Sequence, residues 1–415
     1  MLEDVPAVVV DPGTTWTRCG LSSDLTPRYT VPSAYAKDGN DLPRVFGDGV
    51  YSYTPSREIF TPVMDGVVYD WDSAAALWSH LGERMGCNLN EQPLSVVEKA
   101  WAPAESRAPA LEAVFEGLGV PLFTLAKAPL CAAVESFRTT ALIVTIGSGR
   151  TSVVPVLDGV VATKAILHSR FAGDFLDAHI LASFQASQID AAPRYQIKQR
   201  AIGLDVGEPS PYAKGPQGTP SFHQYQQARI VQRFKQVTAE VSPFPLNNPG
   251  SGAVDAAGRP INIPNQSSSI RPFEFPSGYH RLFGPERMAM VEPLFKPGAT
   301  AQSGLQVPEN SLGLTELIYQ SIGKVEAPTE VIMNLVSNIV LTGGTTQLQG
   351  LPRRVENDLI AMKPNSPFRF HLARGNVTWA GARVMASFGH FDSSWITKAE
   401  YEEIGAEQLA EKRFK

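Results

Sequence analysis

The stretch that decides the fold is Ala7-Val-Val-Val-Asp-Pro-Gly-Thr-Thr15, a β-branched strand that runs into a tight glycine turn. An extended run from Trp16 to Leu21 follows it directly. Two strand-like runs joined by a short turn of Gly and Thr are typical of a β-hairpin. We therefore expect a tight hairpin close to the beginning of this sequence.

The same local pattern occurs again near the middle of the chain. Leu142-Ile-Val-Thr145 leads into Ile146-Gly-Ser-Gly149, and Thr151-Ser-Val-Val-Pro-Val156 returns as a second strand. Two copies in a chain of 415 residues predict an internally duplicated fold. Helical stretches with apolar residues at i, i+3 and i+4, the first beginning near Asp70, alternate with strand-like runs. That alternation favours the α/β class.

Composition limits the classes of function. The formal charge of -5 and the lack of a dense Lys/Arg stripe argue against direct nucleic-acid binding as the main role. No apolar run reaches the roughly 18 residues of a membrane span, so we expect a soluble protein without a membrane partner. The cysteines are far apart, which excludes a zinc site or a disulfide framework and favours a reducing compartment. They are Cys19, Cys87 and Cys131.

A third glycine turn, Gly343-Gly-Thr-Thr346, follows the strand-like run Asn338-Ile-Val-Leu-Thr342. A single glycine turn is a weak signal, but the order Asp-x-Gly-Thr, Gly-x-Gly and Gly-Gly-Thr resembles the two phosphate loops and the adenosine motif of the actin superfamily. Other matching segments extend to the end of the chain. They are Arg138-Thr-Thr140, Ala172-Gly-Asp174, Phe283-Gly-Pro-Glu-Arg287, Glu292-Pro-Leu-Phe-Lys-Pro297, Trp379-Ala-Gly-Ala382 and Trp395-Ile-Thr-Lys-Ala-Glu-Tyr401.

The resemblance implies the actin fold, in which duplicated ribonuclease H-like domains surround a nucleotide cleft. It also implies a division of the chain into four parts. These are 1–137, the small half with subdomains 1 and 2 and a shortened subdomain 2; 138–330, the large half with subdomains 3 and 4 and Pro/Gly-rich insertions at 205–220 and 243–272; 331–378, a return segment with the adenosine motif; and 379–415, C-terminal helices back in subdomain 1.

Glycine turns hold phosphate because their backbone N–H groups converge and no Cβ obstructs the approach. By resemblance, Asp11 is a candidate for the cation side of such a site, and its alternative interpretation is a turn-forming aspartate after a strand. The expected nucleotide-side residues are Asp11, Gly13, Thr14, Thr15, Gly147, Ser148, Gly149, Gly173, Lys235, Gly343, Gly344 and Thr345. Gln236 replaces the acid that would hold the ribose, so these residues leave open whether ATP is bound.

The second loop departs from the family pattern Asp-x-Gly-Asp-Gly, because Thr145 and Ser148 are neutral hydroxyls. By position, Lys127 replaces the glutamine that orients water, and Ser152 replaces the assisting histidine. Phosphoryl transfer depends on water positioning and on charge stabilisation, so we expect a rate loss of about a thousandfold or more. The resemblance thus predicts no enzymatic activity and no required cofactor. Lys127 is an alternative partner for a phosphate or for Asp11.

The segment Ala36-Lys-Asp-Gly-Asn-Asp-Leu42 does not resemble actin's filament loop, which favours a monomeric subunit. Actin's partner cleft accepts amphipathic helices. By position it would be lined here by Gly159, Val160, Met385 and Phe388, with His390 and Ser394 nearby.

Phe175-Leu-Asp177, the altered second loop and the C-terminal segment are most similar to the fungal actin-related subunits of SWI/SNF and RSC remodellers. That family implies a nuclear scaffold that pairs with a second actin-related protein, other remodeller subunits and the HSA helix of the remodeller ATPase. The open alternatives are an active actin-superfamily ATPase and a cytoskeletal protein of the dynactin type. Phosphate release and co-purification distinguish the three.

Overall fold

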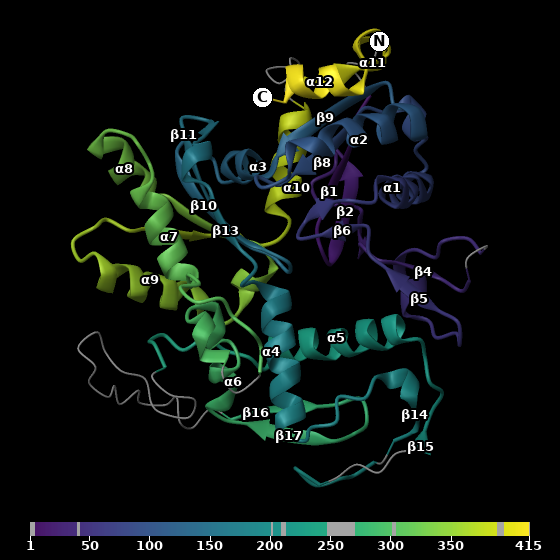
Figure 1. Cartoon of the computed structure of the whole chain (residues 1–415), viewed down its shortest axis with the longest axis vertical. Coiled ribbons are helices and arrows are strands. Elements are labelled where there is room, and N and C mark those ends of the chain that lie inside the picture. The colour runs from purple at the N-terminus through teal and green to yellow at the C-terminus, as the bar shows by residue number, and fades with distance from the viewer. Residues whose placement is uncertain are drawn as a thin grey trace.

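The computed structural model describes residues 5–39, 42–200, 202–208, 213–246, 270–300, 304–387 and 394–414. Two mixed sheets form the centres of two lobes, and helices cover them (Figure 1). The α/β class expected from the alternation of strands and helices is confirmed. Among the described residues, none of the helices combines the length and the apolar character that crossing a membrane requires.

The first sheet has the strand order β20-β9-β8-β1-β2-β3. Strands β1 and β2 form the hairpin expected from the opening stretch, and β8 and β9 then add in parallel. Because β20 pairs with β9, the C-terminal segment returns to this sheet. The strands are β1 (Val8–Pro12), β2 (Trp16–Leu21), β3 (Tyr29–Pro32), β8 (Leu94–Glu98), β9 (Leu122–Lys127) and β20 (Ile396–Thr397).

The second sheet repeats this topology in the order β12-β11-β10-β18-β19, with β13 paired to β11. Strands β10 and β11 form the second glycine hairpin, and β18 and β19 add in parallel. The duplication predicted from the two hairpins is therefore present. The strands are β10 (Ala141–Ile146), β11 (Thr151–Leu157), β12 (Val160–Val161), β13 (Leu167–Ser169), β18 (Ile339–Thr342) and β19 (Phe370–Leu372).

Two helices connect the lobes. Helix α3 (Ala128–Glu135) follows the first sheet, and α10 (Val377–Ser387) packs against it so closely that a Cβ on Gly381 would lie 1.8 Å from the carbonyl oxygen of Cys131. Trp379 of α10 is fully buried, and its Nε1 donates to the Val9 carbonyl of β1 at 3.0 Å. The C-terminal part of the chain is thereby anchored beneath the first hairpin.

The remaining helices follow from local signals. Asp70 caps α1 (Trp71–Met85) by accepting from the Ser73 amide, and Gly86 ends it in the left-handed region with φ 73°. Helix α2 (Arg107–Glu112) is continued by a π-helical turn over Ala113–Gly117. The others are α4 (Gly173–Ala186), α5 (Pro220–Val237), α6 (Glu286–Ala289), α7 (Leu314–Gly323), α8 (Thr329–Val336), α9 (Leu351–Met362), α11 (Lys398–Ile404) and α12 (Ala406–Arg413).

Short strand pairs complete the described architecture. They form four separate two-stranded ribbons outside the main sheets. Their strands are β4 (Tyr35–Lys37) with β5 (Glu58–Phe60), β6 (Val63–Met64) with β7 (Val67–Val68), β14 (Ile197–Gln199) with β15 (Ala213–Lys214), and β16 (Arg271–Glu274) with β17 (His280–Phe283).

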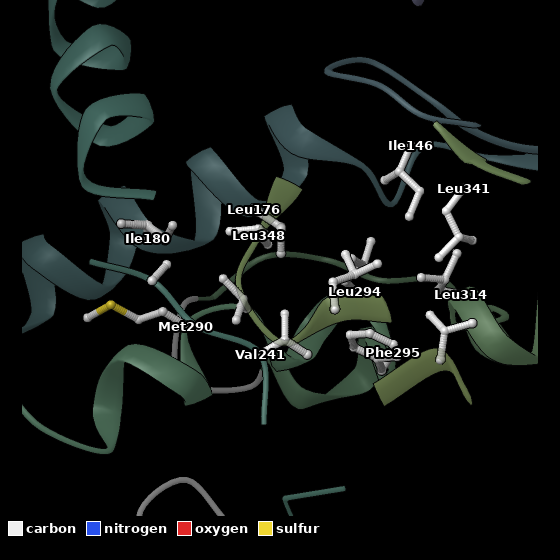
Figure 2. Packing of buried hydrophobic residues seen from close by; sticks show 14 of the residues in the cluster. Ile146, Leu176, Ile180, Val241, Met290, Leu294, Phe295, Leu314, Leu341 and Leu348 are labelled. Atoms are coloured by element: carbon white, nitrogen blue, oxygen red, sulfur yellow. The ribbon is translucent and has the colours of Figure 1, made fainter. Parts of the chain in front are cut away.

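Each lobe has its own apolar core. In the lobe of the second sheet, Leu176 and Ile180 of α4 belong to one buried cluster with Leu294, Leu314 and Leu348 (Figure 2). In the other lobe, Trp78 and Leu81 of α1 are buried against the first sheet. Separate cores make each sheet a stable frame for the turns that face the space between the lobes.

Candidate functional site

A cavity of about 460 Å³ lies between the two sheets, and all three glycine turns reach it. This volume is in the range of small-molecule pockets. The turns meet there because β1 and β10, each central in its sheet, carry the first and second turns, and β18 lies parallel to β10 and carries the third. The sequence-predicted residues that line it are Asp11, Gly13, Thr14, Thr15, Thr145, Gly147, Ser148, Gly149, Ser152, Lys235, Gly343, Gly344 and Thr345.

Two of these glycines are required by close backbone approaches. Gly343 has φ 99°, and a Cβ there would lie 2.3 Å from the carbonyl oxygen of Ile146. A Cβ on Gly149 would lie 2.8 Å from the Cα of Asp65, which belongs to the opposite lobe. Side chains at these positions would push the turns apart, so glycine here sets the shape of the cavity.

The two hairpin turns bond to each other across the cleft. Thr15 Oγ1 donates to Ser148 Oγ at 2.8 Å, and Ser148 Oγ in turn donates to the Asp174 carboxylate. The Ser148 hydroxyl stands at a position where the sequence departs from the family pattern. This departure therefore forms part of a direct link between the lobes.

Gly173 packs against the second turn and does not line the cavity, which corrects its prediction as a nucleotide-side residue. Its amide donates to the Gly147 carbonyl at 3.0 Å, and Thr345 Oγ1 donates to the same carbonyl at 2.8 Å. The role of Gly173 is to let α4 begin directly against the turn, where a Cβ would lie 2.9 Å from Thr345 Oγ1.

Asp11 is paired with two basic side chains of its own lobe. Its Oδ1 lies 2.6 Å from Lys99 Nζ and its Oδ2 lies 3.7 Å from Arg18 Nη1, while its side chain is 2% exposed. Burial alone would raise the pKa of Asp11, but Lys99 and Arg18 outweigh it and hold this pKa below its ordinary value. The carboxylate is ionised and its charge is already compensated.

A divalent cation does not fit this arrangement, which corrects the expectation of a cation site at Asp11. Mg²⁺ needs oxygen ligands, and both carboxylate oxygens of Asp11 face cations of the protein. Across the part of the chain that the structure describes, no group of three or more His, Cys, Asp or Glu side chains is placed to hold a metal.

Lys99 was missed by the sequence analysis, and a strand assignment over 94–98 would have found it. Strand β8 runs parallel to β1, with Val96 beside Val10. Residues that follow the carboxyl ends of parallel strands meet at one edge of the sheet, which places Lys99 next to Asp11.

Lys127 does not line the cavity, whereas Ala128 and Pro129 do. The prediction that Lys127 stands in the water-orienting position is therefore wrong, and so is its alternative role as the partner of Asp11. The physical reason is that successive side chains of a strand point to opposite faces of the sheet. A shift of one residue at the end of β9 therefore turns the side chain to the other face. Ala128 has no polar group with which to orient water.

A second charged cluster connects the lobes at Asp65, which lies in the β6–β7 turn with φ 55°. Its Oδ2 accepts from Arg150 Nη2 and from Arg170 Nε, both at 3.0 Å. Trp101 Nε1 donates to the Asp65 carbonyl at 2.9 Å and supports the turn. This connection between the β6–β7 ribbon and the lobe of the second sheet was also missed, because its members are far apart in sequence.

Lys235 lines the opposite end of the cavity and also braces two helices. Its Nζ donates to the Gly173 carbonyl at 2.8 Å and lies 2.7 Å from Asp177 Oδ1. Burial raises the pKa of Asp177 to about 6, although Lys235 opposes this change. Gln232 and Gln236 of the same helix, α5, complete this end.

Aromatic residues join the segment around Tyr51 and Tyr53 to the other lobe. Tyr53 stacks on Tyr195 with ring centroids 5.2 Å apart, and its hydroxyl donates to the Gln217 carbonyl at 3.0 Å. The guanidinium of Arg229 on α5 lies 3.7 Å from the ring centroid of Tyr51. In Figure 1, β5 accordingly lies next to one end of α5. The segment around Tyr51 and Tyr53 is thus docked directly on the other lobe.

The predicted partner-cleft residues lie around α3. Gly159 and Val160 form the turn into β12, which contacts α3, and Met385 Sδ lies 3.8 Å from Cys131 Sγ of that helix. Ser394 is exposed and lies 3.4 Å from Thr124 Oγ1. The remaining predictions, Phe388 and His390, lie outside the described residues.

Comparison with known proteins agrees with this geometry. The actin family pattern matches residues 2–415. The chain is 32% identical to the SWI/SNF and RSC complexes subunit arp42 of Schizosaccharomyces pombe, covering all of both chains. It is 32% identical to actin-related protein 4 of Yarrowia lipolytica, covering all of this chain and 97% of the other. With actin-related protein 4 of Arabidopsis thaliana the identity is 28%, over 99% of each chain.

Similarity along the whole length fits the duplicated sheets, the paired glycine hairpins and the third turn between them. Among these relatives are a subunit of the SWI/SNF and RSC complexes and proteins named actin-related protein 4. By its sequence and by the fold that positions its cleft, this chain belongs to the actin family.

Proposed function

We propose that this chain is a non-catalytic actin-related subunit of a nuclear, ATP-dependent chromatin-remodelling complex of the SWI/SNF or RSC type. The observation that carries the proposal is the identity of 32% to a subunit so named, over the complete length of both chains. In this role the protein scaffolds the complex together with a second actin-related protein and the HSA helix of the remodeller ATPase.

The chemistry of the cleft supports a non-catalytic role. Phosphoryl transfer needs an oriented water and stabilisation of the charge that develops on the transferred group. Ala128 and Ser152 offer no strong base, Thr145 and Ser148 are neutral, and the Asp11 carboxylate is paired with Lys99. Phosphate release from Mg-ATP should stay at the level of a blank without protein. Sustained turnover by the isolated chain would contradict the proposal.

Exposed apolar side chains around α3 support a helix-binding surface. Phe137, just after α3, is 94% exposed, and Val160 in β12 is 68% exposed. Both are close in sequence to a backbone hydrogen bond in which the Gly159 amide donates to the Thr139 carbonyl. An amphipathic helix binds such a surface by inserting its apolar face, so this region fits the HSA helix.

The partner is tested by titrating a synthetic HSA peptide into the purified chain. We expect Val160→Asp to weaken binding by about tenfold or more, because a charge would be buried against the apolar face of the peptide. Ile202→Asp is the matched control, since Ile202 is 88% exposed and is not near α3 in sequence. If dynactin components co-purify and no remodeller subunit does, the cytoskeletal alternative replaces the proposal.

A further inference from the structure

The cleft is positively charged although the chain is acidic. Its lining contains four basic side chains, Arg18, Lys99, Arg150 and Lys235, and two acidic ones, Asp11 and Asp65. Asp177, just outside the lining, compensates Lys235, so the excess lies with Arg18, Lys99 and Arg150. The formal charge of the whole chain is -5. A concave, partly enclosed site focuses the field of such an excess, so this cavity favours an anion.

Strand pairing on both sides of β8 fixes the position of Lys99. It follows β8, which is paired in parallel with both β1 and β9, and its ammonium lies 2.6 Å from Asp11 Oδ1. Its side chain is 13% exposed, so its stem is held within the lobe. An ammonium has three donors, and Asp11 takes only one of them.

Lys99 therefore stands where a phosphate-binding cleft needs a cation. Asp11 is the last residue but one of β1, which leads directly into the turn Gly13-Thr14-Thr15. The backbone amides and hydroxyls of this turn are suited to phosphate oxygens. A bound Mg²⁺ would have to displace Lys99 from Asp11 and would find neutral hydroxyls at Thr145 and Ser148 on the other turn. Retaining Lys99 costs no such rearrangement.

We propose that Lys99 is a built-in counter-ion and that the cleft binds a phosphate-bearing anion, such as a nucleoside triphosphate, without a divalent cation. Asp11 orients the ammonium toward the first glycine turn, and Arg18 balances the second oxygen of Asp11. The negative charge of the anion balances the excess of basic side chains in the lining of the cavity. This inference concerns only the isolated chain, so its failure leaves the proposed remodeller role standing, and the reverse also holds.

The primary test uses the unaltered protein. Calorimetry measures the affinity for ATP in EDTA and in excess Mg²⁺, with tripolyphosphate as a second probe that lacks the nucleoside. We expect ATP to bind in EDTA with an affinity equal to or greater than that in Mg²⁺, because Mg²⁺ masks the phosphate charge that Lys99 recognises. Binding that tightens by about tenfold or more with Mg²⁺, or no binding of either probe, would overturn the proposal.

A substitution of Lys99 should reverse the effect of Mg²⁺ on ATP binding. Lys99→Met keeps most of the apolar stem and removes the ammonium, which leaves Asp11 with only the more distant Arg18. ATP binding in EDTA should therefore fall by about tenfold or more, and Mg²⁺ should now restore part of it. Lys164→Met is the control, because Lys164 is exposed, pairs with Glu326 and does not line the cavity. Unchanged ATP binding by Lys99→Met in EDTA would contradict the role of Lys99.

Folding is checked separately, because removal of one member of a buried pair can destabilise the protein. The double variant Lys99→Met with Asp11→Asn removes both charges and should be closer to the wild type in stability. It should still lose binding in EDTA, but Mg²⁺ should not restore it, since the carboxylate is gone. Restoration by Mg²⁺ in this double variant would contradict the assignment of Asp11 as the group that Lys99 covers.

Discussion

The two glycine hairpins have the same backbone arrangement but different electrostatics. The β1–β2 hairpin retains a carboxylate, Asp11, and compensates it with Lys99 and Arg18. The β10–β11 hairpin has no carboxylate in its turn, and its Ser148 accepts from Thr15 across the cleft. The shape of such a turn depends on glycine and strand pairing, whereas its charge depends on side chains that can change independently. The shape of the cavity can therefore persist while the charges that line it change.

The largest effect should follow from breaking the ion pair between Lys99 and Asp11 of the first hairpin. Lys99→Met leaves the 2%-exposed Asp11 with only the more distant Arg18, so we expect the free energy of unfolding to fall by about 3 kcal/mol. Denaturant unfolding measures it, with Lys164→Met as the control. A loss below about 0.5 kcal/mol would mean that solvent reaches Asp11 and that the pair contributes little.

The same pair predicts a dependence on pH. The pKa of Asp11 is lower in the folded protein than its ordinary value, so the unfolded chain takes up protons first on acidification. The stabilisation is complete above the ordinary aspartate pKa of about 4 and is lost as the pH falls through the folded value. Unfolding of wild type and Asp11→Asn between pH 7 and pH 3 should show a shallower acid loss for the variant. Parallel curves would contradict this.

A smaller effect is expected in the second hairpin. Ser148→Ala removes the hydrogen bonds to Thr15 and Asp174 but leaves no buried charge, so unfolding free energy should fall by about 1 kcal/mol. Hydrogen exchange at the two turns should become faster, because the link between the lobes is weakened. A loss as large as that of Lys99→Met would show that the two hairpins are equally charge-dependent.

The smallest effect should come from Arg170→Ala. Arg170 is 69% exposed, and its ion pair with Asp65 is screened by solvent, while Arg150 keeps its own contact with Asp65. We expect a change within about 0.5 kcal/mol in unfolding free energy. A matched Arg150→Ala variant should have a larger effect, since Arg150 is the less exposed partner. Equal losses would indicate that the Asp65 cluster acts as one unit.

Local patterns in the sequence determined the hairpins and helices of this protein. A β-branched run followed by glycine specifies a strand and a turn wherever it occurs, and Asp70 and Gly86 mark both ends of α1. For the same reason the three turns, and with them the cavity-lining residues that the turns carry, could be predicted. The family pattern then indicated which carboxylates the second turn lacks.

Only the tertiary structure decided which charges meet. Lys99 reaches Asp11, 88 residues away, because β8 pairs with β1, and Asp65 reaches Arg150 because the two lobes close on each other. The one-residue difference between Lys127 and Ala128 was likewise decided by where β9 ends. Turn geometry is set by neighbours along the chain, whereas electrostatic compensation depends on side chains brought together by packing, which local sequence does not encode.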